Sequence, residues 1–411
     1  MKLKIIKEAN AVSRELLEIE SEEAKVIIGF GEEVGTGDVA ERINPMIDGL
    51  TTGTPNYDGV FVLRNPENCN IVDYALKDIP IFLVRKLKSL YDVCMDFKKL
   101  TKKENIKGII ESETNKVKDL EITPYLVDSS NFNTYILHIK DKFGKSVVIS
   151  GDFKNYDGSY GQDKLNTAIS IIKNADVLIV EGKYLGKHGL EFSSGKEILE
   201  KLRNIMKFYK QVFVLQSETD LIMASNIYQA ALKTKKIFVE SSFLCNLATI
   251  ANGSCPSPFS AKKVYSYNPL VLENMDFEFK KKYVVPFSIS SALTKMKKGK
   301  YVMNVTKDFL QDIQILEKER AFYDACIIVS EWKGFMEDDK ELEDFMNVLK
   351  SYDMDYYELY THGQVNMNTI KEMIYKLRPK VVIPLDFSNE KNVENQLDNF
   401  KVLKDGEQIK V

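Results

Sequence analysis

Hydrophobic positions in the first part of the chain recur with the short period of β-strands. Apolar and polar residues alternate on both sides of Phe143-Gly144, which predicts a β-hairpin. Residues 58–63 form a nearly continuous apolar run, as expected of a strand that is covered on both faces. By the same criteria we expect further strands at 2–9 and 15–31, with a hairpin between them, and at 79–83 and 175–182.

Beyond residue 193 the pattern changes to an alternation of helices and strands. Segments with helical spacing are followed by short apolar runs, which predicts parallel βα units. The helices are expected at 194–210, 220–236 and 366–378, and the strands at 211–217, 236–241, 325–330 and 380–387. We therefore predict an α/β core, residues 1–192 and 350–411, that is interrupted by an α/β insert, residues 193–349.

Composition narrows the class of protein. The chain has 411 residues, which favours roughly two or three domains. Hydrophobic residues make up 44% and charged residues 28%, as in soluble globular proteins, and the net charge of −3 gives no overall basic surface for nucleic acid. No apolar run reaches about 18 residues, so we expect no membrane span, and the cytoplasm is the expected location.

Few residues in the chain suit a transition metal. The five cysteines are scattered without CxxC spacing, which argues against both a disulfide framework and a cysteine zinc site. There are only three histidines, at positions 138, 188 and 362, and this number excludes a His-rich metal site.

Several segments together resemble one family. They are GVFVLRNPENCNIVDYALKDIPIFL (59–83), PYLVDSSNFNTYILHIKDKFGKSVVISGDFK (124–154), DVLIVEGKYLGK (176–187), SEWKGFMED (330–338), THGQVNMNTIKEMIYKLRPKVVIPLDF (361–387) and VLKDGEQIKV (402–411). In their order and spacing they are similar to metallo-β-lactamase-fold proteins of the β-CASP, ribonuclease J-like type. The resemblance implies an αββα sandwich with an inserted α/β β-CASP domain. Active members of this family are metal-dependent hydrolases, often zinc nucleases that act on RNA or DNA.

The family's HxHxDH metal loop follows a core strand, and its positions in this sequence carry unsuitable residues. They read Arg64, Pro66, Asn68 and Cys69. Arginine stays protonated and brings a positive charge, and proline has no side-chain donor. Asparagine is a poor zinc ligand, so that only Cys69 could still coordinate a metal.

The other ligand positions of the family are also altered. Ser129, after Val127-Asp128, stands in place of a histidine, and Gln364 replaces another, with His362 two residues earlier. Asp386 stands where the family has its last histidine. Asp152 in SGDF keeps the family's bridging aspartate. Gly29 occupies the place of the aspartate that orients the metal loop, and Glu181 matches the acidic residue that opens the β-CASP region.

Each of these residues also has an ordinary structural interpretation. Asp152 could cap a turn or pair with Arg64, which would replace metal–carboxylate attraction by an ion pair. Cys69 could be a small buried hydrophobe, and His362 a polar turn residue. Asp386 could cap a helix, and Glu181 could be a strand-end carboxylate in a turn.

Two further features bear on nucleic-acid binding. At the start of the insert, 217–222 resembles the family's S-S-x-N-x-x-R segment but has gained acids and lost the arginine, which disfavours phosphate. The basic runs 277–283 and 295–301 could touch phosphates, although a solvated face is the commoner interpretation.

Together these substitutions predict a catalytically inactive pseudoenzyme that binds a protein or RNA partner. No cofactor is expected and no residue is assigned as catalytic. The alternative is a metal-dependent, nuclease-like hydrolase whose rebuilt site uses Asp128, Asp152, His362, Asp386 and Cys69 with zinc or manganese; Asp152 and Asp386 are its strongest metal candidates. A nucleic-acid-binding protein without catalysis is the third hypothesis. The resemblance also implies a homodimer.

Overall fold

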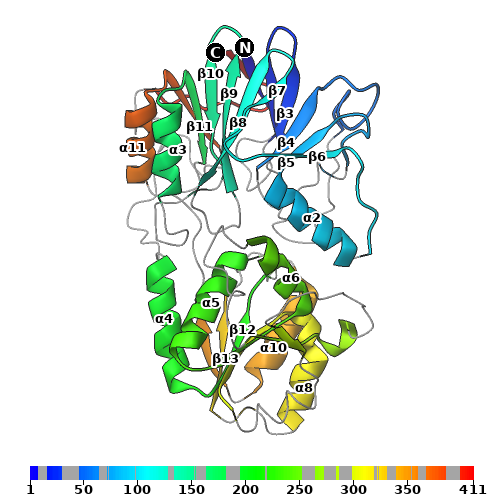
Figure 1. Ribbon diagram of the computed structural model, residues 1–411, viewed down its shortest axis with the longest axis vertical. Helices are drawn as coiled ribbons and strands as arrows, with labels where there is room; N and C mark the ends of the chain where they lie inside the picture. Colours follow the sequence, from blue (N-terminus) through cyan, green and yellow to red (C-terminus); the bar gives the residue numbers. More distant parts are fainter. Residues whose placement is uncertain are drawn as a thin grey trace.

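The computed structural model describes most of the chain. The described residues are 1–7, 16–29, 46–63, 72, 74–97, 99–127, 134–151, 153, 163–181, 195–217, 220–251, 264–272, 284–286, 299–318, 322, 324–330, 339–352, 354–359, 367–385 and 399–411. Their strands form three sheets, two in one half of the molecule and one in the other (Figure 1). The class is α/β with mixed and parallel sheets, as predicted.

The first sheet is mixed. Its strands, in spatial order, are β20 (Gln408–Lys410), β1 (Lys2–Lys7), β2 (Leu16–Glu20), β3 (Lys25–Gly29), β4 (Gly59–Val62), β5 (Ile81–Val84) and β6 (Ile106–Ile109). The strands from β3 to β6 are parallel, whereas β1 pairs antiparallel with both β2 and β20. The β1–β20 pair brings the two ends of the chain together (Figure 1).

The second sheet combines antiparallel hairpins with parallel strands. Its order is β19 (Val381–Leu385), β11 (Val177–Glu181), β10 (Ser146–Ile149), β9 (Thr134–Asp141), β8 (Leu120–Val127) and β7 (Asn115–Val117). The predicted hairpin is confirmed: β9 and β10 are antiparallel, and Gly144 has the positive φ of 78° that its turn requires. The strands β10, β11 and β19 are parallel.

Side-chain alternation places the core between these two sheets. On one face of the second sheet, Leu137, Val147 and Ile179 join the apolar cluster that contains the first sheet. On the other face, Val148 and Leu178 pack against two helices, α3 (Lys164–Ile172) and α11 (Met367–Leu377). A further helix, α2 (Arg85–Phe97), packs along β5 and β6. Helices therefore flank a pair of facing sheets.

The third sheet is parallel throughout. Its order is β15 (Val284–Pro286), β14 (Val264–Ser266), β13 (Ile237–Glu240), β16 (Tyr301–Val305), β12 (Gln211–Leu215), β17 (Ala325–Val329) and β18 (Asp355–Glu358). This confirms the predicted parallel βα units. Because β18 pairs with β17, the sheet continues past residue 349, the predicted end of the insert.

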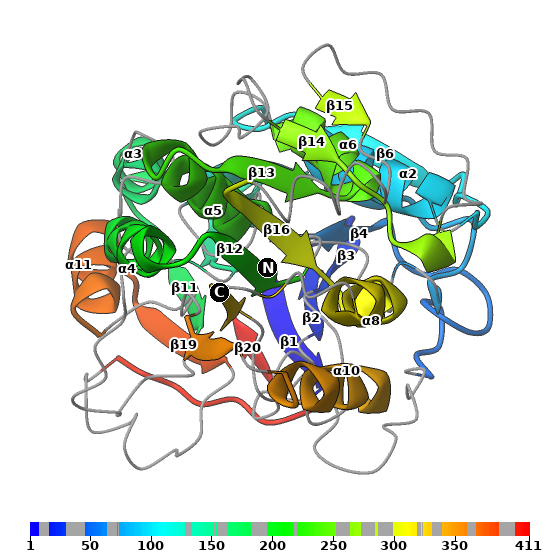
Figure 2. The ribbon, with the colours of Figure 1, turned by 90° about the horizontal axis from the view of Figure 1, so that it is seen from below.

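Helices cover both faces of the third sheet (Figure 2). On one face lie α4 (Gly195–Phe208), α5 (Leu221–Lys233) and α6 (Ser242–Ala251). On the other lie α8 (Leu310–Lys318), which continues the short 3-10 helix η4 (Lys307–Phe309), and α10 (Lys340–Lys350). Acidic residues cap two of these helices: Asp220, at the start of α5, accepts from the Met223 backbone N–H at 2.8 Å, and Asp339 caps α10 in the same way.

One predicted strand is two strands. Residues 15–31 contain β2 and β3, which pair antiparallel across a tight turn in which Ser21 N–H donates to the Ala24 carbonyl at 2.9 Å. The turn has no glycine or proline, so the apolar residues on its two sides resemble one continuous segment.

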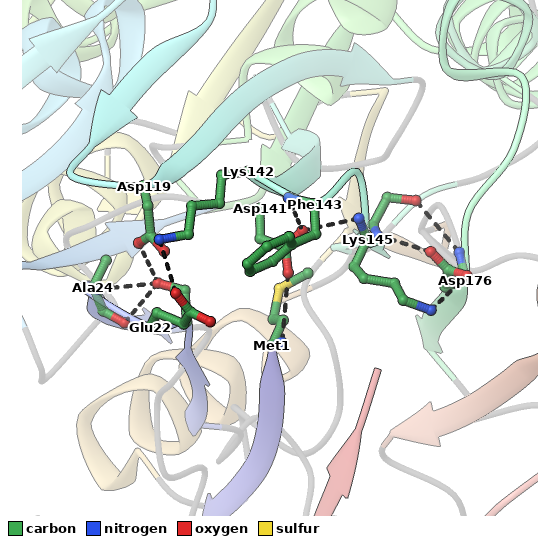
Figure 3. A network of polar contacts seen from close by, with 11 residues as sticks. Met1, Glu22, Ala24, Asp119, Asp141, Lys142, Phe143, Lys145 and Asp176 are labelled. Atoms are coloured by element: carbon green, nitrogen blue, oxygen red, sulfur yellow. Dashed lines mark hydrogen bonds and ion pairs between the residues drawn. The ribbon is translucent and has the colours of Figure 1, made fainter.

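Polar contacts join the sheets at the amino ends of their parallel strands (Figure 3). Lys142, in the β9–β10 turn, pairs with Glu22 of the β2–β3 turn at 2.8 Å. Asp176, just before β11, accepts from the Ser146 backbone N–H at 3.0 Å and from Lys380 Nζ at 2.7 Å. Through these two bonds Asp176 links β11 to β10 and to β19 at this edge.

Candidate functional site

The carboxyl ends of several core strands meet at one edge. In the second sheet Glu181 lies opposite Leu385, so that β11 and β19 end together, and β10 ends two residues earlier, where Ile149 lies opposite Ile179. The end of β8 joins them, since Val127 pairs with the first residue of β9. Connections at this edge are where parallel α/β sheets carry their functional groups.

The first sheet reaches the same edge at Gly151. A Cβ added to Gly151 would lie 3.8 Å from Cβ of Leu63, which follows β4, and 3.0 Å from Cγ2 of Thr134. The backbone carbonyl of Tyr135 would lie 3.3 Å away. The two tight distances are to β9 of the same sheet, so a larger residue would need a small shift there, whereas Leu63 lies at ordinary van der Waals distance and shows that the ends of the two sheets are side by side.

The predicted site residues follow these converging ends in the sequence. Arg64 comes directly after Leu63, Asp152 after Gly151, and Asp386 after the last residue of β19. Consecutive Cα atoms are about 3.8 Å apart, so the segments that carry these residues leave from this edge. Phe153, beyond Asp152, is fully buried in the cluster with α3 and α11 and anchors the SGDF segment.

The predicted side chains themselves lie outside the described residues. This holds for Arg64, Pro66, Asn68, Cys69, Asp128, Ser129, Asp152, His362, Gln364 and Asp386. For Glu181 the backbone is described as the last residue of β11. Gly29 ends β3 and lies opposite Val62 of β4, which places it in the strand next to the one that leads to the predicted metal loop. Within the described part of the chain, no group of three or more His, Cys, Asp or Glu residues could hold a metal ion.

The carboxyl edge of the third sheet is turned toward the core. The helix α6 starts directly after β13, and its Phe243 stacks on Phe97 at the end of α2 with ring centroids 4.2 Å apart. The helix α2 in turn starts directly after β5 of the first sheet. The carboxyl edges of both halves therefore border the same region of the molecule (Figure 1).

This edge of the insert holds buried polar side chains that sequence reasoning did not single out. Asn304, near the end of β16, donates through Nδ2 to Glu240 Oε2, and Glu240 also accepts from the Ser241 backbone N–H at 2.9 Å. Gln216, just after β12, is 2% exposed, and Thr306 follows β16. Their common signal in the sequence is a polar residue at the end of an apolar strand.

A buried histidine lies away from both edges. His138 of β9 is opposite Val148 and Thr123, and its Nε2 has no hydrogen-bond partner. Burial, with a smaller effect from the charge of Lys140, lowers the pKa of this imidazole to about 4. His138 therefore stays neutral in the fold and belongs to the core.

Comparison with known proteins shows the fold alone. No family model and no curated protein matches the sequence. A solved structure of a protein of unknown function from Enterococcus faecalis V583 has a TM-score of 0.75 and 13% identity to this chain, and the match covers 99% of both chains. Among the described helices, none is long and apolar enough to cross a membrane.

Proposed function

We propose that the chain has a metallo-β-lactamase core with a β-CASP insert and works as a catalytically inactive binding protein for an RNA or protein partner. The observation that carries the proposal is the convergence of strand ends at Gly151. It puts the starts of the substituted segments at one edge, where the family resemblance expects a metal centre.

The arrangement of elements supports the fold part of the proposal. Two facing sheets are flanked by helices, and a parallel sheet of 195–358 is inserted between β11 and α11. This order agrees with a core that is split by an α/β insert. Since the similar solved structure has no stated function, the activity must be argued from the residues at the edge.

Those residues argue against a two-metal hydrolase. Such an enzyme needs imidazoles and carboxylates that converge on ions about 3.5–4 Å apart. The segment after β4 offers Arg64 and Pro66 in place of imidazoles. A guanidinium near the edge would repel a metal ion and would attract the Asp152 carboxylate instead.

Metal content tests the inactive part of the proposal. Protein purified without chelators or added metal should contain far less than one zinc or manganese ion per chain by elemental analysis. An Arg64–Asp152 ion pair predicts a favourable coupling free energy between Arg64→Met and Asp152→Asn in a double-mutant cycle. Stoichiometric metal that is lost in Asp152→Asn would contradict the proposal.

Partner binding tests the other part. Fluorescence anisotropy with labelled single-stranded RNA at several salt concentrations measures the number of phosphate contacts, with a log–log slope of about −0.7 for each contact. A steep slope would make RNA the partner. A flat profile with no RNA binding, together with the absence of any stable protein complex in cell extracts, would refute the binding role.

One observation favours the alternative, a metal-dependent hydrolase. In the sequence an acidic residue stands at or shortly after the end of each of three adjacent strands: Glu181 is the last residue of β11, Asp386 follows β19 directly, and Asp152 comes three residues after the end of β10. An all-carboxylate set suits manganese better than zinc. Manganese-dependent cleavage of RNA by wild-type protein, abolished in both Asp152→Asn and Asp386→Asn, would establish this alternative.

A further inference from the structure

The third sheet has a topological switch point between β12 and β16. The strands β12 and β16 are neighbours, but the helix that follows β12 (α5) packs on one face of the sheet, and the helix that follows β16 (α8) packs on the other. In parallel sheets, ligands bind beyond the carboxyl ends of strands at such a switch point. The residues that follow β12 and β16 are therefore the place to look for binding groups.

Three polar residues gather at this point. Leu215 and Val305 are opposite each other at the ends of β12 and β16, so that Gln216 and Thr306 come next on neighbouring strands. Asn304 is two positions before Thr306, in extended backbone, and therefore shares its face of the sheet. The register partner of Asn304, Val214, belongs to the cluster on the α5 face.

These residues have unused hydrogen-bonding groups. Both amide atoms of Gln216, Oδ1 of Asn304 and Oγ1 of Thr306 are buried without a partner. Thr306 precedes η4 in the N-cap position, yet its hydroxyl makes no capping bond. Asn226, on the helix α5 that packs against β16, has an unpartnered Nδ2 as well. Unsatisfied buried groups are rare in native proteins, and a set on adjacent strands points to a ligand.

The chemistry of the set selects the ligand. Gln216 offers a donor and an acceptor side by side, Asn304 adds an acceptor, and Thr306 can act as either. None of these groups carries a charge, and the carboxylate of Glu240, on the same face, disfavours an anion. A planar, neutral group with adjacent N–H and C=O atoms fits this pattern, as a carboxamide pairs with the edge of a nucleobase.

We propose that the carboxyl ends of β12 and β16 bind an uncharged nucleobase, whose edge is recognised by Gln216 with Asn304 and Thr306 beside it. This binding goes beyond the proposed function, because it uses the insert alone. It does not depend on whether the carboxyl edge of the core holds a metal ion. Its failure would leave the proposal about the core edge unchanged.

Calorimetric titration of the full chain with uridine, cytidine, adenosine and guanosine tests the proposal. At least one nucleoside should bind, and ribose alone should not. Because no phosphate contact is involved, affinity should be nearly independent of salt, and the nucleoside monophosphate should bind no more tightly than the nucleoside. Failure of all four nucleosides to bind at millimolar concentration would overturn the proposal, as would binding by ribose alone.

Variants locate the site. Gln216→Met keeps the side-chain length, removes both amide atoms and should weaken nucleoside binding by about tenfold or more. The matched control is Gln211→Met, the same change at the buried amino end of the same strand, which should leave affinity unchanged. Thr306→Val should also weaken binding and carries the test if Gln216→Met does not fold. The proposal would be refuted if Gln216→Met and Thr306→Val both bound nucleosides as tightly as the wild type. It would also be refuted by a crystal structure with nucleoside in which only ordered water contacts Gln216.

Discussion

The amino and carboxyl edges of the two core sheets differ in the contacts that join the sheets. At the amino edge, Asp176 and Lys142 tie turns and strands of both sheets together through hydrogen bonds and ion pairs (Figure 3). At the carboxyl edge the sheets meet at Gly151, where only a hydrogen side chain fits without displacement, and long connections leave. The contacts at the amino edge contribute to stability, and under the proposed function the carboxyl edge is the one that binds the partner.

This division leads to a general expectation. Changes at the amino edges or in the core should alter the free energy of unfolding but not partner binding. Changes at the carboxyl edges should alter binding more than stability. Four substitutions can break or sharpen this contrast.

The largest expected effect is the response of His138 to acid. In the unfolded chain the imidazole of His138 has a pKa of 6.5, whereas in the folded protein burial lowers its pKa to about 4. The contribution of His138 to stability is therefore constant above pH 6.5 and falls by about 3 kcal/mol as the pH drops from 6.5 to 4. Chemical denaturation of wild type and His138→Leu across this range should show a flatter profile for the variant. Parallel profiles would mean that another group causes the loss.

Asp176→Ala should cost about 2 kcal/mol, because it removes the acceptor for the Ser146 N–H and for Lys380 Nζ. Burial alone would raise the pKa of this carboxyl, but the bond from Lys380 and the other contacts outweigh it, and the pKa is lowered. The difference between variant and wild type should therefore shrink as the pH falls below 3.8. Lys380→Met, which leaves the Ser146 contact intact, should cost less. Any loss of partner binding in Asp176→Ala, measured where both proteins are folded, would contradict the division between edges.

Strands such as β4, β11, β12 and β17 could be predicted because their apolar runs are strong, whereas β16 was not predicted. The strand β18 could not, since Asp355 and Glu358 are exposed and its two tyrosines are half-buried, as on the edge of a sheet. Residues 355–358 form a strand because they pair with β17, which lies well before them in the sequence. The predicted insert, residues 193–349, therefore does not include this strand.

The positions of the candidate site residues came from the family resemblance, whereas the closeness of the strand ends that precede them is seen only in the structure. That Arg64 and Asp152 follow strand ends could be read from the sequence, but the meeting of those ends at Gly151 depends on how two sheets pack. Gln216 and Thr306 were not singled out because each is an ordinary polar residue after a strand. Only the register of β12 and β16 brings them together.

Lys236 shows that an amino edge can also contain a destabilising group. It is 2% exposed, and its Nζ donates to the Tyr209 carbonyl at 2.7 Å. Burial, together with the charge of Lys300, lowers its pKa from 10.5 to about 8. At pH 7 the buried charge is unfavourable, so Lys236→Met should stabilise the protein by about 2 kcal/mol after loss of the hydrogen bond.

The pH dependence distinguishes this explanation from simple packing. Wild-type stability should rise between pH 8 and 10.5, because the folded state loses the lysine proton first, and the advantage of the variant should disappear over that range. Unfolding by denaturant at several pH values measures both curves. A constant difference would show that the charge is not responsible.

The smallest effect on stability should come from Gly151→Ala, and it tests the contrast most directly. The added methyl group would lie 3.0 Å from Thr134 Cγ2, so the strand ends must shift by a few tenths of an ångström, at a cost of about 1 kcal/mol. Gly144→Ala is the matched control: its Cβ meets nothing within 4 Å, but φ of 78° makes alanine similarly costly, by about 1 kcal/mol. Both variants should lose similar stability, yet only Gly151→Ala shifts the adjoining ends of β9 and β10, directly before Asp152 in the sequence. Partner affinity should therefore fall in Gly151→Ala and stay unchanged in Gly144→Ala; equal affinities would place the binding surface away from the carboxyl edge of the core.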